Sequence, residues 1–208
     1  MCTMEESSTP RQKLSLALLH EFRRASIALK EFSVLAPGLI GDKADIQHRL
    51  ATYDSYGRFI HHLFEFYKGC AASDGSKYVN LIGCKLDRVI QPEVEKLMKH
   101  RADRIARGDG ASWDNHESYY REPVPEKFAE DFRSVRNQLA HVTISRAISS
   151  SAEAVSLPTF YERYHRFALL LHEEACLLWN SQNEDSVDWE EIGRFQDVIM
   201  GKSINEDT

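Results

Sequence analysis

The sequence predicts an all-helical fold, a bundle of about five to six helices. Three observations favour this fold class. Apolar residues recur at spacings of three and four over most of the chain, which is the period of an amphipathic helix. No segment longer than a few residues alternates apolar and polar positions as a strand does. With 10 Gly and 6 Pro, and with 42% hydrophobic and 28% charged residues, the composition is that of a folded globular chain.

The length of 208 residues suits one core better than two domains. We therefore expect residues 1–208 to form a single helical domain. Residues 1–10 are expected to be a flexible N-terminus, and residues 182–208 a C-terminal tail that carries a short helix.

The first two helices are expected to form a long antiparallel hairpin. The first spans Pro10 to Leu35 and is ended by Pro37 and Gly38, and the second spans Asp42 to Tyr67, with Gly69 at the position of a C-terminal stop. Apolar residues recur at helical spacing in both. They are Leu14, Leu18, Phe22, Ala25, Leu29 and Phe32 in the first, and Ile46, Leu50, Tyr53, Ile60, Leu63 and Tyr67 in the second.

A third helix is expected from about Lys77 to Arg107, broken or kinked at Pro92, because proline removes a backbone donor and clashes with the preceding turn. Residues 108–125 combine turn-forming residues with Trp113, Tyr119 and Tyr120, and are predicted to be a long irregular loop.

Three further helices complete the predicted bundle. One runs from Pro125 to about His141, one from Pro158 to about Asn180, and a short one from Trp189 to Met200. The helix that begins at Pro125 is expected to bury a stripe that lies within about 40° of one direction. The stripe consists of Phe128, Phe132, Val135 and Leu139.

Composition excludes several classes of protein. No apolar run approaches the roughly 20 residues that a membrane span needs, and the polar residues 1–10 do not resemble a secretion signal. The four cysteines form no Cys-x-x-Cys pair, so no zinc or redox motif is present and a reducing, cytoplasmic location is expected. A net charge of −6 argues against general coating of nucleic acid, so any such contact must be local.

One polar cluster lies on the helix that begins at Pro125. Asn137 and His141 are one turn apart and point almost opposite to the apolar stripe, while Arg136 lies on the flank between the two faces. Such a cluster suits metal-independent RNA cleavage. Imidazole can exchange a proton with the ribose 2′-hydroxyl or the leaving oxygen, and guanidinium can stabilise phosphate charge. Since one imidazole cannot easily act as base and acid in the same step, we expect a homodimer that pairs two copies of His141.

The run Arg136-Asn-Gln-Leu-Ala-His141 resembles the signature of the HEPN superfamily, which is an arginine, usually followed by a polar residue, and then a histidine after four to six residues. This family is helical, commonly dimeric, and includes metal-independent ribonucleases of toxin–antitoxin, abortive-infection and phage-defence systems. The resemblance implies that Arg136, Asn137 and His141 are catalytic, that no metal or cofactor is needed, and that RNA and an antitoxin or regulatory protein are partners. Thr143 stands where toxins paired with a nucleotidyltransferase carry tyrosine, so that subgroup is not favoured.

Alternatives remain for each feature. Arg136 could instead pair with a carboxylate such as Glu130 or Asp131 on a solvated helix face, and the protein could be a non-catalytic module that binds nucleotide, RNA or a protein. The side chains of His61, His62 and Glu65 could instead be ligands of a di-metal site. Arg166 and His172 also match the arginine–histidine spacing, but the residues between them are typical of a core.

A basic stripe at Lys85–Arg107 carries seven cations against four acids and could be an RNA track, or an ordinary solvated helix face. The aromatic residues of the loop at 108–125 could stack on bases or anchor the loop to the core. The RNA-binding candidates are Arg133, Lys99, Arg101 and Arg104.

Overall fold

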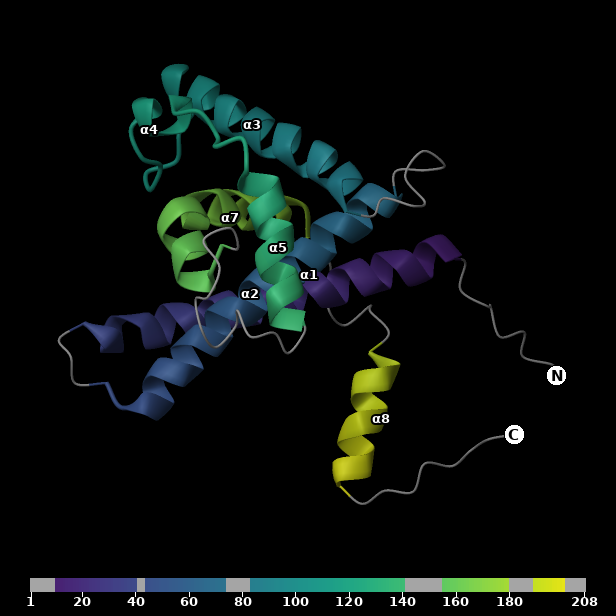
Figure 1. Ribbon diagram of the computed structural model, residues 1–208. Coiled ribbons are helices and arrows are strands. Elements are labelled where there is room, and N and C mark those ends of the chain that lie inside the picture. Colours follow the sequence, from purple (N-terminus) through teal and green to yellow (C-terminus); the bar gives the residue numbers. More distant parts are fainter. Residues whose placement is uncertain (1–9, 41–43, 74–82, 141–154, 180–188, 201–208) are drawn as a thin grey trace.

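The computed structural model describes residues 10–40, 44–73, 83–140, 155–179 and 189–200. These residues form seven α-helices, one short 3-10 helix and no strand, which confirms the all-helical prediction (Figure 1). None of the described helices is long and apolar enough to cross a membrane. The elements are α1 (Pro10–Leu35), η1 (Ala36–Leu39), α2 (Ile46–Ser73), α3 (Cys84–Ala106), α4 (Glu117–Arg121), α5 (Phe128–Ala140), α7 (Leu157–Trp179) and α8 (Glu190–Ile199).

Helices α1 and α2 form the expected hairpin, whose closed end projects from the rest of the bundle (Figure 1). Helix α2 was predicted to end near Gly69, but it continues to Ser73. A Cβ atom at Gly69 would lie 2.5 Å from Cδ2 of Leu18. The glycine therefore allows α1 and α2 to approach closely inside the helix, and the prediction that it ends the helix was wrong.

Helix α3 is continuous through Pro92, so the predicted break is wrong as well. Buried side chains lie on both sides of the proline, among them Ile90 and Val94. Beside it, Gln91 donates from Nε2 to the carbonyl of Pro125 at 3.1 Å and accepts from the amide of Ala129 at 3.2 Å. These contacts fasten α3 to the start of α5 and oppose the roughly 3 kcal/mol that a proline inside a helix costs.

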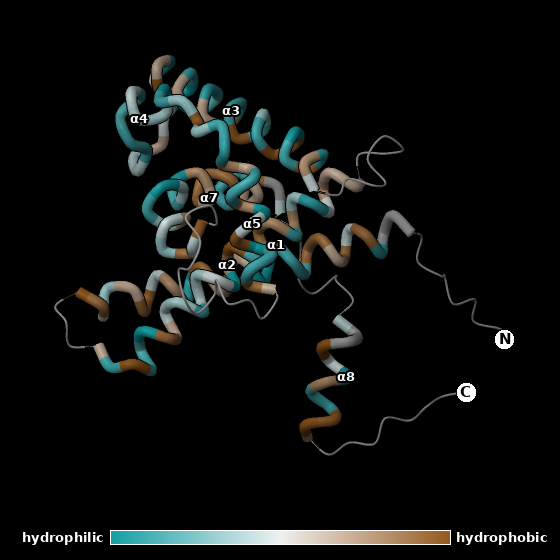
Figure 2. Tube along the Cα trace, viewed as in Figure 1, coloured by the Kyte–Doolittle hydropathy of each residue, from teal (hydrophilic) through white to brown (hydrophobic). Residues whose placement is uncertain are grey.

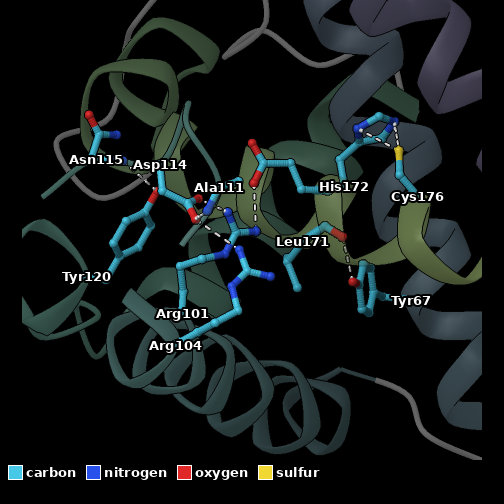
Figure 3. A network of polar contacts seen from close by, with 11 residues as sticks. Tyr67, Arg101, Arg104, Ala111, Asp114, Asn115, Tyr120, Leu171, His172 and Cys176 are labelled. Atoms are coloured by element: carbon cyan, nitrogen blue, oxygen red, sulfur yellow. Dashed lines mark hydrogen bonds and ion pairs between the residues drawn. The ribbon is translucent and has the colours of Figure 1, made fainter. Parts of the chain in front are cut away.

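The segment predicted to be an irregular loop contains helix α4 and is fixed by an acidic side chain. Asp114, whose side chain is 3% exposed, binds Arg101 at 2.5 Å, Arg104 at 2.9 Å and the amide of Ala111 at 2.8 Å (Figure 3). The prediction missed α4 because five residues carry too little periodicity to be recognised.

The core lies where α5 and α7 cross α2. Phe128, Phe132 and Val135 of α5 are fully or almost fully buried, and Leu139 packs against them while partly exposed. The predicted stripe is therefore the buried face of α5, and it meets Phe160 and Phe167 of α7.

Helix α8 stands apart from the bundle and alternates apolar and polar segments (Figures 1 and 2). At its start, the Trp189 ring stacks on His20 of α1 with centroids 4.5 Å apart. In the part of the chain that the structure describes, α8 packs against no other helix. Its apolar side chains are exposed, namely Ile192, Phe195, Val198 and Ile199.

Candidate functional site

The last turns of α5 hold two of the three predicted catalytic residues. The Arg136 side chain is 21% exposed, and its guanidinium donates to the Oδ1 atom of Asn137 at 3.1 Å. Asn137 is exposed on the surface opposite the buried stripe. His141 lies outside the described residues. The structure thus brings Arg136 and Asn137 together, and the part that His141 plays stays a prediction.

Helix α2 supplies the surface on which Arg136 rests. The guanidinium forms an ion pair with Glu65, and its carbon lies 6.0 Å from the centroid of the Phe64 ring. The carboxylate partner is therefore Glu65 rather than Glu130 or Asp131, and Asp131 instead accepts from the Tyr164 hydroxyl at 2.7 Å.

Both groups of this ion pair have a further feature. Glu65 also binds Lys68 at 3.0 Å, so two cations share its charge. The Nε atom of Arg136 is buried without a hydrogen-bond partner among the described residues. An unmet buried donor is unfavourable, and because this Nε atom is shielded from solvent, an added acceptor would have to bind the exposed part of the guanidinium.

Two imidazoles of α2 extend the cluster. His61 lies one turn before Glu65, and the ring centroids of His61 and His62 are 5.1 Å apart. His62 is held by Glu21 of α1, with 2.8 Å between Nδ1 and Oε2. Burial lowers the pKa of His61, and the nearby His62 and Arg136 lower it further. His61 is therefore neutral at pH 7 and able to accept a proton.

Sequence reasoning considered these imidazoles only as metal ligands. In the described ranges, no group of three or more His, Cys, Asp or Glu side chains is placed to hold a metal ion. The relation of His61 to Arg136 depends on the packing of α5 on α2, which no local motif in either helix indicates.

Three of the four RNA-binding candidates have acidic partners. Arg133 makes a two-pronged contact with Asp87, at 2.8 to 3.1 Å. Arg101, which is 9% exposed, binds Asp114 and, at 2.9 Å, Glu173, and Arg104 shares Asp114 (Figure 3). These guanidiniums connect α3 to the segment before α4, to α5 and to α7.

The fourth candidate, Lys99, is exposed and lines a small hollow of about 320 Å³ between α3 and α4. The loop aromatics divide between the two roles considered for them. Tyr120 is buried beside Arg101, whereas Trp113 is 78% exposed.

The second arginine–histidine match lies in the core, as its sequence context indicated. His172 is 9% exposed and 2.9 Å from the Ser26 hydroxyl, with Cys176 Sγ 3.7 Å from its Nδ1 atom (Figure 3). Burial lowers the pKa of His172 to about 4, so it is neutral at pH 7. Arg166 pairs with Glu122 instead of approaching His172.

Comparison of the chain with protein-family models, with curated proteins and with solved structures finds no match. The function is therefore argued from the residues around Arg136 and from the motif.

Proposed function

We propose that this protein is a metal-independent endoribonuclease of the HEPN type. The observation that carries the proposal is the joint placement of Arg136 and Asn137 at the end of α5, the segment that leads directly to His141. The partly exposed guanidinium of Arg136 supports it, because a phosphate oxygen is an acceptor that a guanidinium binds well.

The reaction needs two proton transfers. An imidazole removes the proton of a ribose 2′-hydroxyl, the 2′-oxygen attacks the adjacent phosphorus, and the bond from phosphorus to the 5′-oxygen breaks. That oxygen then takes a proton from a second, protonated imidazole. In this scheme Arg136 stabilises the charge on the phosphate oxygens, and Asn137 orients the guanidinium or the substrate. The products are a 2′,3′-cyclic phosphate and a 5′-hydroxyl.

Two groups are candidates for the second imidazole. One is His141 of a second copy, across the homodimer that the sequence predicts. The other is His61 of the same chain, whose lowered pKa suits the neutral base that takes the 2′-hydroxyl proton, so that His141 would then be the protonated acid. His61→Ala decides between them: a fall of roughly a hundredfold or more in the cleavage rate selects His61, and an unchanged rate selects the second copy.

Cleavage of total RNA in EDTA tests the function. We expect discrete products from the wild-type protein, and rates lower by roughly a hundredfold or more for Arg136→Ala and His141→Ala. Asn137→Ala should have a smaller effect. The matched control is His100→Ala, which removes an exposed imidazole of α3. Activity lost in EDTA, or a fully active His141→Ala protein, would contradict the proposal.

The second candidate function is a non-catalytic helical module that binds nucleotide, RNA or a protein through the same surface. The ion pair between Arg136 and Glu65 favours it, because a carboxylate already occupies one edge of the guanidinium. Binding of RNA without cleavage, under the conditions of the assay above, would select this function. A role in a toxin–antitoxin or phage-defence system, with an antitoxin or regulatory protein as partner, follows only if cleavage is found.

A further inference from the structure

A cleft of about 400 Å³ lies between α1, α2 and the start of α7. Four of its ten lining residues are aromatic, namely Phe32, Tyr53, Tyr56 and Tyr161. Tyr56 is buried, and its ring centroid lies 5.1 Å from that of Tyr161. Tyr161 is 43% exposed, and its ring also stacks on His165 with centroids 4.6 Å apart, so a base could extend this stack from the exposed part of the ring.

The cleft adjoins the end of α5, where the motif lies. Its wall includes Leu157, and a Cβ atom at Gly57 of α2 would lie 3.6 Å from Cδ2 of Leu157 and 2.9 Å from Cδ2 of Leu139. Leu139 follows Asn137 by two residues. Leu157, Gly57 and Leu139 thus form a continuous contact from the cleft to the buried side of the last turns of α5, whose opposite side carries Asn137.

Positive charge flanks the aromatic wall, although the whole chain carries a net charge of −6. Arg49 lines the cleft, is exposed, and donates from Nε to the carbonyl of Ala44 at 3.0 Å. Within the described ranges it has no carboxylate partner, unlike Arg101, Arg104 and Arg133. Tyr161 also lines a polar hollow of about 430 Å³ that includes Arg163 and Glu162, together with Arg166, whose charge is paired with Glu122.

We propose that this cleft binds a base of single-stranded RNA, stacked on Tyr161, with an adjoining phosphate at Arg49. Aromatic rings beside cations are the usual platform for single strands, because every base has a face that stacks. The inference rests on the proposed function and deepens it: the cleft would hold a base of the bound strand that lies beyond the nucleotides at the cleaved bond. It also places RNA binding at this cleft between α1, α2 and the start of α7, and not at the ion-paired arginines of α3.

Binding can be measured without cleavage, using a fluorescent single-stranded 2′-O-methyl oligoribonucleotide of about ten nucleotides. Fluorescence anisotropy should show Tyr161→Ala to bind roughly five- to 150-fold more weakly than wild type, which is the range for loss of one stacked base. Tyr161→Phe, which keeps the ring, should bind like wild type. The matched control is Phe195→Ala, which removes an exposed aromatic side chain on α8, a helix that packs against no other described helix, and should leave the affinity unchanged.

The salt dependence of binding provides an independent readout. It tests the cleft assignment even if circular dichroism shows that Tyr161→Ala does not fold. Loss of one phosphate contact in Arg49→Ala should lower the slope of log Kd against log salt concentration by about 0.7. An unchanged slope, equal affinities for Tyr161→Ala and wild type, or no binding by wild type would each overturn the inference. Adenosine monophosphate could also displace the oligonucleotide at a concentration equal to the Kd of the oligonucleotide. That result would overturn the assignment to RNA and show that the cleft binds a free nucleotide.

These outcomes separate the two proposals. Binding that depends on Tyr161, without cleavage of unmodified RNA, would refute the endoribonuclease and leave the cleft assignment intact. Cleavage of RNA, together with binding that is unchanged in Tyr161→Ala and Arg49→Ala, would refute the cleft assignment and leave the endoribonuclease intact.

Discussion

Replacing Asp114 with alanine should destabilise the fold more than any change to an exposed ion pair. The Asp114 side chain is 3% exposed and joins Arg101, Arg104 and the amide of Ala111. The hydrogen bonds from these three groups outweigh burial and hold the pKa of Asp114 below its ordinary value. In the variant, Arg101 stays buried and keeps only Glu173, which is 47% exposed and therefore well screened by water.

Removing one partner of a buried ion pair costs about 3 to 5 kcal/mol, because the other charge is left buried without compensation. Since Glu173 still contacts Arg101, we expect the lower end, about 3 kcal/mol. For a chain of this size, 1 kcal/mol corresponds to a shift of roughly 2 to 4 °C in Tm, so Tm should fall by about 6 to 12 °C.

Urea unfolding followed by circular dichroism measures this loss, and an unchanged m value would show that the unfolded state is the same. The control is Asp109→Ala, which removes a carboxylate that is 66% exposed and 3.5 Å from Arg107. That change should cost no more than about 0.5 kcal/mol. A loss below about 1 kcal/mol for Asp114→Ala, or one equal to the control, would refute the structural role assigned to this side chain.

Two further predictions concern the core. Burial lowers the pKa of His172 to about 4, against about 6.5 in the unfolded chain, so the unfolded state binds more protons as pH falls through this interval. The free energy of unfolding should decrease from pH 6.5 to pH 4 by up to roughly 3 kcal/mol through this residue. His172→Gln should show a correspondingly flatter dependence in urea midpoints measured across that range. Gly57→Ala should cost no more than about 1 kcal/mol, because the new Cβ would lie 2.9 Å from the flexible Cδ2 end of Leu139 while alanine favours the helix by roughly 0.5 to 1 kcal/mol. Adding Leu139→Ala should recover part of that loss, and strictly additive costs in the double variant would count against the contact.

Hydrophobic periodicity predicted the long helices well. The bounds predicted for the first helix, Pro10 to Leu35, are those of α1, and the helices expected from Pro158 and Trp189 correspond to α7 and α8. These elements follow local rules, because one face of each helix carries a continuous set of apolar side chains. The buried stripe of α5 was predictable for the same reason.

Where the sequence misled, a contact between distant segments outweighed a local preference. Pro92 and Gly69 are helix-breaking by propensity, but Gln91 fastens α3 to α5, and Leu18 fills the space that Gly69 leaves open. Propensity cannot predict such pairings, because the partners lie far apart in the chain.

The same limit applies to the candidate site. The motif identified Arg136 and Asn137, and the structure shows that they share one surface. Neither Glu65 as the partner of Arg136 nor the position of His61 followed from any spacing within one helix. The sequence did not predict Asp114 as the shared partner of Arg101 and Arg104 either, because Asp114 belongs to a segment without helical periodicity.

The chemistry of the product ends tests the central proposal most directly. An RNA of defined sequence would be incubated with the protein in EDTA, and the fragments analysed by mass spectrometry and by their susceptibility to polynucleotide kinase. The account predicts a 2′,3′-cyclic phosphate on one fragment and a 5′-hydroxyl on the other, with no cleavage of a substrate that carries 2′-deoxyribose at the cleaved position. Fragments that end in a 3′-hydroxyl and a 5′-phosphate, or cleavage of the deoxy substrate, would contradict it.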